Sequence, residues 1–225
     1  MGFSFFFMEP LREINENIFL ISDTHLFHDR IVEYEPVRKR YLEEGFPSHE
    51  DWIIDNWNST VGERDLVLHL GDFIFKPQFY LEFATFLNGR KLLVAGNHDA
   101  KGKLLDGYSK YFEAVVGRGK VAVVSSKGVE VVETEHFLAN GIVTTVGGIR
   151  ILFSHYPVFV TEQYRSKAVK ALEKIFHDYR CDINIHGHVH SKTIDHPRLL
   201  NVSFEAIGFK PIRLKELLER KVDYL

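Results

Sequence analysis

Five short polar motifs occur along this chain in a fixed order, and each follows a run of aliphatic residues. Their side chains carry carboxylate and amide oxygens or imidazole nitrogens, which are atoms that divalent metals bind in proteins. Together they offer two aspartates, one asparagine and four histidines as potential ligands, with one further histidine to spare. The motifs are Asp23-Thr24-His25, Gly71-Asp72, Gly96-Asn97-His98-Asp99, Ser154-His155-Tyr156-Pro157 and Gly187-His188-Val189-His190.

Such a donor set is sufficient for two divalent metal ions in one pocket. Two metals held close together clamp the attacking and leaving oxygens of a displacement at phosphorus, and they generate hydroxide at neutral pH. Nitrogen and oxygen ligands without thiolate favour Mn, Fe, Zn, Co or Ni, whereas four histidines disfavour an all-oxygen Mg or Ca site. Two carboxylates against two divalent ions leave a charge of about +2, which is complementary to a phosphate ester.

The composition is typical of a globular α/β protein. The 225 residues, 45% hydrophobic and 26% charged, suffice for a single domain with a sizeable core over residues 1–225. A net charge of −3 gives no general basic surface for nucleic acid. Cys181 is the only cysteine, which excludes an intramolecular disulfide and favours a reducing compartment, the cytoplasm. No apolar stretch approaches the length of a membrane span, and Phe3 to Met8 is too short for a signal peptide.

Hydrophobic periodicity predicts alternating strands and helices, an α/β architecture. In the helix predicted over residues 78–87, four residues are expected to face inward: Phe79, Phe83, Phe86 and Leu87. A Val-, Thr- and Ile-rich stretch over residues 114–153 predicts a β-meander that contributes to a second sheet or projects from it, with hairpin turns at 126–128 and 140–141. The predicted strands are 18–22, 66–70, 91–95 and 182–186, and the predicted helices are 49–61, 78–87, 163–179 and 213–220.

The motifs lie just past predicted strand ends, where the loops of an α/β sheet converge on one crevice. A glycine precedes three of the potential ligands, which permits a sharp turn and close packing. Asp23 and His25 are two residues apart, as are His188 and His190, so each pair would point to one side of an extended segment. Any single motif is weak evidence, since a lone histidine such as His155 is more often structural. The order of all five is the specific signal.

In this order the motifs resemble those of the calcineurin-like metallophosphoesterases, whose pattern is D-x-H, G-D, G-N-H-D/E, H and G-H-x-H. The resemblance runs from about residue 18 to residue 201. Longer phrases, among them His69-Leu70-Gly71-Asp72-Phe73 and Leu87-Asn88-Gly89-Arg90-Lys91, are similar to small prokaryotic and phage members. The resemblance implies a β-sandwich of two mixed sheets flanked by helices, in αββα layers.

The resemblance also implies a role for each motif residue. Asp72 would bridge two metals. His98 would face the phosphate and protonate the leaving oxygen or stabilise its charge, while Asp99 would accept a hydrogen bond from His98. The first metal would be held by Asp23, His25 and His190, and the second by Asn97, His155 and His188.

Two further residues are candidates for substrate binding. His28 would lie at the mouth of the site, with a surface role as the alternative. Arg30 could reach a phosphate, although a plain salt bridge is the simpler interpretation. The segment 121–148 is longer than expected from similar chains, and it would form a substrate cap, an oligomer contact or simply a longer hairpin.

The function that the resemblance implies is hydrolysis of a phosphoric ester by metal-bound hydroxide. A phosphodiester is favoured over a monoester, with a nucleotide or a nucleic-acid end as possible substrate. A phosphomonoesterase acting on proteins or small molecules is the alternative within enzymes. A non-catalytic, metal-bearing scaffold is the alternative from another class, and the completeness of the ligand set argues against it.

Overall fold

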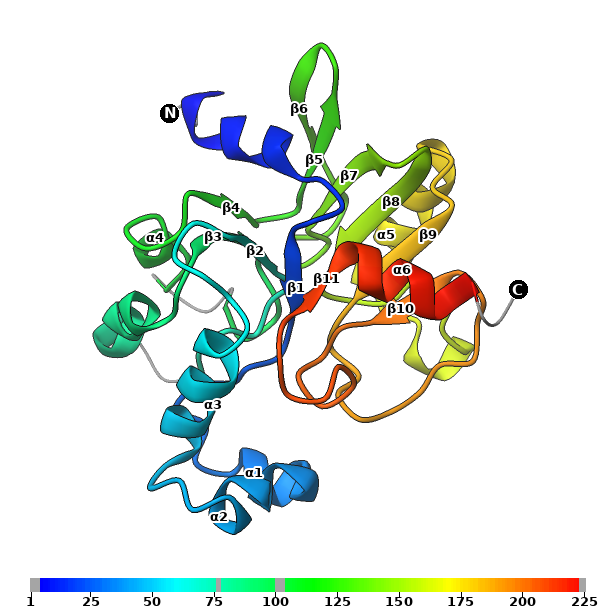
Figure 1. The fold of residues 1–225 in the computed structure, drawn as a ribbon. Coiled ribbons are helices and arrows are strands. Elements are labelled where there is room, and N and C mark those ends of the chain that lie inside the picture. The colour runs from blue at the N-terminus through cyan, green and yellow to red at the C-terminus, as the bar shows by residue number, and fades with distance from the viewer. Residues whose placement is uncertain (1–4, 76–77, 100–103, 223–225) are drawn as a thin grey trace.

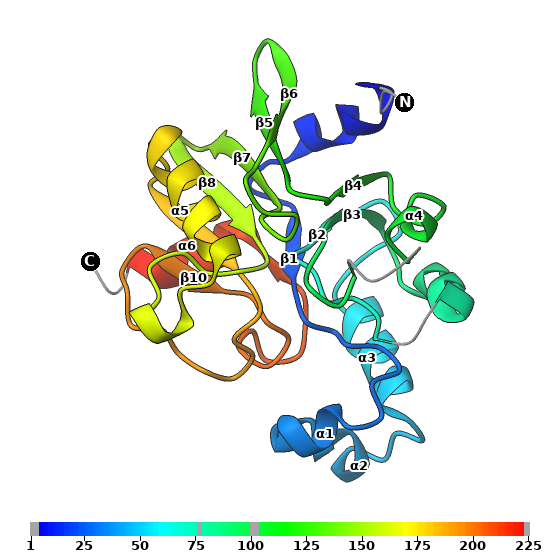
Figure 2. The ribbon, with the colours of Figure 1, turned by 180° about the vertical axis from the view of Figure 1, so that it is seen from behind.

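The computed structural model describes residues 5–75, 78–99 and 104–222, and two mixed β-sheets form its centre (Figure 1). In the first sheet the strand order is β11-β1-β2-β3-β4, in which β11 runs antiparallel to β1 and the other neighbours are parallel. The second sheet has the order β10-β9-β8-β7-β5-β6. Helices flank both sheets, which confirms the predicted fold class (Figure 2).

The strands of the first sheet are β1 (Phe19–Ile21), β2 (Leu66–His69), β3 (Arg90–Val94), β4 (Ala114–Val116) and β11 (Ile212–Arg213). Those of the second are β5 (Lys120–Ser125), β6 (Gly128–Glu133), β7 (Gly141–Val146), β8 (Ile149–Ser154), β9 (Ile183–His186) and β10 (Leu199–Asn201). The α-helices are α1 (Ile31–Tyr34), α2 (Arg40–Glu43), α3 (His49–Asn58), α4 (Leu104–Tyr108), α5 (Lys167–Asp178) and α6 (Leu214–Val222). Short 3₁₀ segments are η1 (Phe5–Glu13), η2 (Pro36–Lys39), η3 (Gln78–Phe86) and η4 (Glu162–Tyr164).

Parallel register brings the motif loops to one edge of each sheet. In the first sheet Ile21 of β1 lies beside His69 of β2, so the two strands end together. In the second sheet Ser154 of β8 lies beside His186 of β9. A bridge between Ser22 and Ser203 then joins the chain just after β1 to the chain just after β10. The loops that follow β1, β2, β3, β8 and β9 therefore open toward a common crevice.

Two predicted helices begin where a serine caps them. The Ser48 side chain accepts a hydrogen bond from the Asp51 backbone N–H at the start of α3. The Ser166 side chain accepts a hydrogen bond from the Val169 N–H, so α5 begins at Lys167. Residues 163–166, which were predicted to be helical with it, instead belong to η4 and to the connection from η4 to α5. The apolar face of α5 packs in one cluster with strands of the second sheet.

The predicted helix over 78–87 is instead a 3₁₀ segment, and the set of residues predicted to face inward was partly wrong. Leu81, Ala84 and Leu87 are buried, a spacing of three residues that matches the 3₁₀ repeat. Phe86, expected inside, is 59% exposed. Phe83 is partly buried against the core, and the side chain of Phe79 lies outside the described ones.

The segment 121–148 contributes two core strands, which confirms the first of the two placements expected for the β-meander, within the second sheet. β5 pairs in parallel with β7, and Val121 and Ile142 have no exposed surface. Only the β5–β6 hairpin extends from the body, at the top of Figure 1, with its turn at residues 126–127 as predicted. The second predicted turn, at 140–141, is wrong, because the β7–β8 hairpin turns at Gly147 and Gly148.

The different burial of β7 and β6 predicts very different losses in the free energy of unfolding for two similar substitutions. Ile142→Ala in β7 should lower the free energy of unfolding by about 2–5 kcal/mol, because it removes a fully buried side chain. Val131→Ala in β6, where valine is 39% exposed, should change it by no more than about 0.5 kcal/mol. Urea denaturation of both variants measures the difference. Equal, small losses would contradict the placement of β7 in the core.

Candidate metal centre

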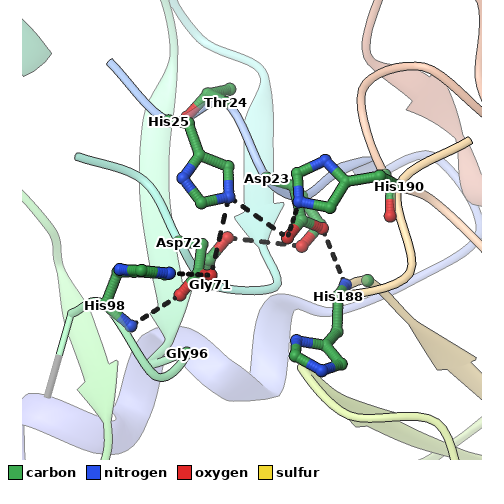
Figure 3. A network of polar contacts seen from close by, with 12 residues as sticks. Asp23, Thr24, His25, Gly71, Asp72, Gly96, His98, His188 and His190 are labelled. Carbon is green, nitrogen blue, oxygen red and sulfur yellow. Dashed lines mark hydrogen bonds and ion pairs between the residues drawn. The ribbon is translucent and has the colours of Figure 1, made fainter. Parts of the chain in front are cut away.

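The five motif loops bring all the predicted ligands together at the crevice between the two sheets. Figure 3 shows Asp23, His25, Asp72, His188 and His190 among them. Asp23 Oδ1 lies 3.8 Å from His25 Nε2 and 3.9 Å from His190 Nε2. The rings of His25 and His190 stack with centroids 5.0 Å apart. Asp23, His25 and His190 thus offer three donor atoms close enough to hold one cation.

A second group of donors lies on the other side of Asp72. His155 Nε2 is 3.1 Å from Asn97 Oδ1 and 3.2 Å from His188 Nδ1. Asp72 Oδ2 stands between the two groups, 3.6 Å from His25 Nε2 and 3.5 Å from His155 Nε2. One carboxylate oxygen is therefore shared by both sets of potential ligands.

Buried polar atoms without partners show that these residues fit cations. Asp23 Oδ1 and both ring nitrogens of His25 are buried and have no hydrogen-bond partner among the described residues. Such atoms are costly to bury unless something satisfies them. Divalent cations would satisfy them, and the mixture of oxygen and imidazole donors suits transition metals.

The electrostatics favour the neutral, metal-binding form of His25 and His188, whereas, despite burial, neighbouring carboxylates raise the pKa of His155 and of His190. Burial lowers the pKa of His25 to about 3 and that of His188 to about 3, so both rings are neutral and able to ligate at neutral pH. Burial raises the pKa of Asp72 to about 7, against the opposing effect of His155. A cation beside Asp72 would favour its charged form.

Several of these residues adopt left-handed backbone conformations, which corrects the expectation that they lie in extended segments. The φ angles are 58° at Asp23, 48° at His25, 55° at Asp72, 70° at His188 and 54° at His190. Each such non-glycine residue costs on the order of 1–3 kcal/mol. These five strained residues all carry side chains of the two donor groups at the crevice.

Two of the preceding glycines are required by close packing. A Cβ on Gly187 would lie 2.0 Å from Ser22 Oγ and 2.4 Å from Asp23 Oδ2. Gly71 combines a φ of 97° with a position where a Cβ would lie 2.5 Å from the Gly96 backbone nitrogen. The predicted close packing is confirmed at both glycines, and the predicted positive φ is confirmed at Gly71.

Behind the first group lies a buried ion pair that motif patterns did not reveal. His190 Nδ1 is 3.2 Å from Glu205 Oε1, and the same oxygen accepts a hydrogen bond from Arg38 Nε. The Arg38 guanidinium also donates to the backbone carbonyls of Asp23 and Thr24. Arg38 is fully buried. Through these contacts Arg38, in η2, is linked to Asp23 directly and to His190 by way of Glu205.

Removing the negative charge of Glu205 should weaken metal binding. Partners of this kind fix the orientation of a ligating ring, and their loss typically costs 10–100-fold in metal affinity. We expect Glu205→Gln to weaken binding of the metal that His190 would hold by about this factor in calorimetric titration of the metal-free protein. Glu63→Gln, at an exposed position, is the matched control and should bind as wild type. Wild-type affinity in Glu205→Gln would refute the positioning role.

His98 lies at the mouth of the crevice. Its side chain is 25% exposed, and its Nε2 is 3.8 Å from Asp72 Oδ2. The ring stands edge-on to His25, with centroids 5.2 Å apart. The backbone N–H of His98 donates to Asp72 Oδ1, which fixes the loop relative to the shared carboxylate. The ring is thus near both the predicted metals and the open side of the site.

The predicted hydrogen bond from His98 to Asp99 does not occur among the contacts of the described residues. The Asp99 carboxylate is fully buried and accepts from the backbone N–H groups of Asp72, Phe73 and Gly96. It also accepts from the Tyr108 hydroxyl at 2.6 Å. Asp99 therefore ties the loop after β2 to the loop after β3 and does not orient the His98 ring.

His28 and Arg30 differ in their relation to the site. The His28 ring stacks on Phe75 with centroids 3.7 Å apart, and it lies 5.5 Å from the His25 ring and 6.5 Å from the His98 ring. His28 therefore lies beside the rings of His25 and His98, and its role in substrate binding stays a prediction. Arg30 pairs with Glu33 at 2.8 Å and lies over the Tyr34 ring on the exposed surface. This is the simple salt bridge, and no described contact turns Arg30 toward the donor groups.

The fold and the donor set define a class of α/β proteins with a histidine- and aspartate-rich metal site at the strand ends. Residues 17–203 match the family model of the calcineurin-like phosphoesterase superfamily domain, and the chain belongs to this family. The family is one of metal-dependent phosphoesterases. The match over residues 17–203 confirms the family that the motifs implied. Within the described ranges no helix is long and apolar enough to cross a bilayer.

Relatives of this chain include prokaryotic and phage proteins. It is 28% identical over 209 residues to the gene 66 protein of Mycobacterium phage L5, covering 85% of this chain and 88% of the phage protein. It is 36% identical over 92 residues to an uncharacterised protein of Methanocaldococcus jannaschii, a match that spans 38% of this chain and 48% of that protein. The solved structure of a protein of unknown function from Aquifex aeolicus superimposes with a TM-score of 0.63 at 28% identity, covering 92% of this chain and 97% of that one.

Proposed function

We propose that this protein hydrolyses a phosphodiester with two divalent transition-metal ions, drawn from Mn, Fe, Zn, Co and Ni. The observation that carries the proposal is the position of Asp72 Oδ2, 3.6 Å from a nitrogen of one donor group and 3.5 Å from a nitrogen of the other. A shared carboxylate oxygen is what two adjacent cations need. Bound there, the ions would supply positive charge for the phosphate and lower the pKa of water.

The protein's own residues would bind the ions and transfer the proton. Asp23, His25 and His190 would hold one cation, Asn97, His155 and His188 would hold the other, and Asp72 would contribute to both sites. His98, partly exposed at the mouth, donates a proton to the leaving oxygen or stabilises the charge that develops there. Asp99 supports this arrangement from below, because it holds the loop that carries His98 against the loop that carries Asp72.

A diester is favoured because the site has room for a second ester group. A cavity of about 1140 Å³ opens beside Asn97, His188 and His190. A phosphomonoester carries one organic group, whereas a diester carries one that leaves and one that stays. We further propose that residues 1–225 work as one domain and that the protein acts in the cytoplasm, which its single, buried cysteine supports.

A panel of substrates and metals tests the proposal. The metal-free protein is supplied in turn with Mn, Fe, Zn, Co, Ni and Mg and assayed on bis(p-nitrophenyl) phosphate and p-nitrophenyl phosphate. We expect at least one transition metal to give a higher kcat/KM on the diester than on the monoester, with Mg less effective. Faster hydrolysis of the monoester would instead identify a phosphomonoesterase. No hydrolysis with any metal, despite two bound ions, would identify a scaffold.

A further inference from the structure

The cavity beside the metal centre has walls from two loops that also carry proposed ligands. One wall is the segment 156–161, which follows His155, and the other is the segment 188–196, which begins with His188. The cavity reaches Asn97, His188 and His190, but His98 does not line it. A group bound there would touch the metal ligands from the side away from the proposed proton donor.

The walls combine aromatic and aliphatic surface with a few polar groups. The rings of Phe159 and His196 stack with centroids 4.5 Å apart and planes 23° apart. Phe159 also packs edge-on against Phe176 of α5 at 5.0 Å, so the aromatic wall is held by the core. Its backbone has a φ of 58°, which is unusual for a bulky residue. Strained residues of this kind cluster at ligand sites.

The charges of the lining argue against a polyanionic ligand. Glu35 and Asp195 provide two carboxylates, and Lys192 provides the single ammonium group among the described lining residues. A polyphosphate or a nucleic-acid backbone would therefore gain little there. A neutral organic group with a flat face and hydrogen-bonding edges fits better, since Thr161 and Thr193 supply hydroxyls along the same walls.

We propose that this cleft binds the ester group that remains on phosphorus, and that this group is a single nucleoside. The inference rests on the proposed function and narrows its substrate to mononucleoside phosphodiesters. The oxygen of water bonds to phosphorus, and the bond from phosphorus to the leaving oxygen breaks. His98 supplies the proton that the leaving oxygen takes and regains the proton that the water releases. The product that stays in the cleft is a nucleoside monophosphate, its base against the Phe159–His196 pair.

Two diesters with one leaving group isolate the contribution of the cleft. Thymidine 5′-(p-nitrophenyl phosphate) and methyl p-nitrophenyl phosphate both release p-nitrophenolate, so they differ only in the group that stays. We expect kcat/KM to be about tenfold or more higher for the thymidine ester, the effect of about one stacked base. A cyclohexyl p-nitrophenyl phosphate of similar bulk should fall well below the thymidine ester.

Two variants and a control locate the effect. Thr193→Trp fills the cleft, and Phe159→Leu removes its aromatic face while keeping an apolar side chain. Each should lower the thymidine-to-methyl ratio by about tenfold. Thr145→Trp, at an exposed threonine of β7 outside the cleft, should keep the wild-type ratio. Melting temperatures of all three verify that they fold.

Binding gives a readout that does not depend on turnover. Thymidine 5′-monophosphate should bind about tenfold more tightly than methyl phosphate in calorimetric titration, and Thr193→Trp should remove the difference. A wild-type ratio near one, equal rates for the cyclohexyl ester, or an unchanged ratio in Thr193→Trp would overturn the nucleoside subsite. Selective nucleotide binding without hydrolysis of any diester would overturn the proposed function and leave the subsite standing.

Discussion

Asp72→Asn should lower hydrolysis of bis(p-nitrophenyl) phosphate by about three orders of magnitude, and bound metal should fall from two ions per chain to one or none. The carboxylate oxygen faces nitrogens of both donor groups, at 3.6 Å and 3.5 Å. An amide of the same shape keeps the hydrogen bond from the His98 N–H but carries no charge to share between two cations. Losing several kcal/mol of transition-state charge stabilisation accounts for a rate loss of this size.

Metal analysis of the purified variant, with a kinetic assay and a melting curve, checks this expectation. Asp178→Asn, at an exposed aspartate of α5, is the control and should match wild type in all three measurements. Full activity of Asp72→Asn with one tightly bound metal would rule out the two-metal assignment. A melting temperature at or above that of metal-free wild type is also expected, because burial makes the Asp72 charge costly when no cation is bound.

His98→Asn should reduce turnover by about 10²-fold while metal content stays at the wild-type level. The ring is partly exposed at the mouth, and the remaining donors already form two groups around Asp72. The loss should appear in kcat more than in KM, because a proton donor acts in the transition state. His177→Asn, at an exposed histidine of α5, is the matched control.

One result would contradict the assignment of His98 as a proton donor. His25, Asp72 and His98 themselves form a group of donors that a cation could join. Loss of one metal ion in His98→Asn, with the same titration for His177→Asn unchanged, would make His98 a ligand and reject its role as a proton donor.

Much of the site could be predicted because its residues follow buried parallel strands. Aliphatic runs place β1, β2, β3, β8 and β9, and parallel register then brings the polar residues after them to one crevice. The local backbone was not predictable in the same way. Asp23 and His25 occupy left-handed conformations that residue spacing does not encode, since they depend on packing across the two sheets.

Other features depend on contacts that no spacing reveals. Arg38 and Glu205 are single charged residues in otherwise ordinary segments, and their pairing joins positions 167 residues apart. Phe86 was expected inside because a period of 3.6 was assumed where the chain turns every three residues. The sequence left open whether the strands of 121–148 join the second sheet or project from it, because valine-rich runs look alike at a sheet edge and in its middle.

The joining of the two chain halves at the metal centre has a consequence for how the protein matures. The His188 backbone N–H donates to Asp23 Oδ2 at 2.8 Å across 165 residues of sequence. At a synthesis rate of roughly 5–20 residues per second, about 10–30 s pass between the emergence of these two residues from the ribosome. During that interval Asp23, His25 and Asp72 lack the partners that complete either donor group. We therefore expect metal capture to be a late event, governed by the metals present once β9 and the loop after it have been made.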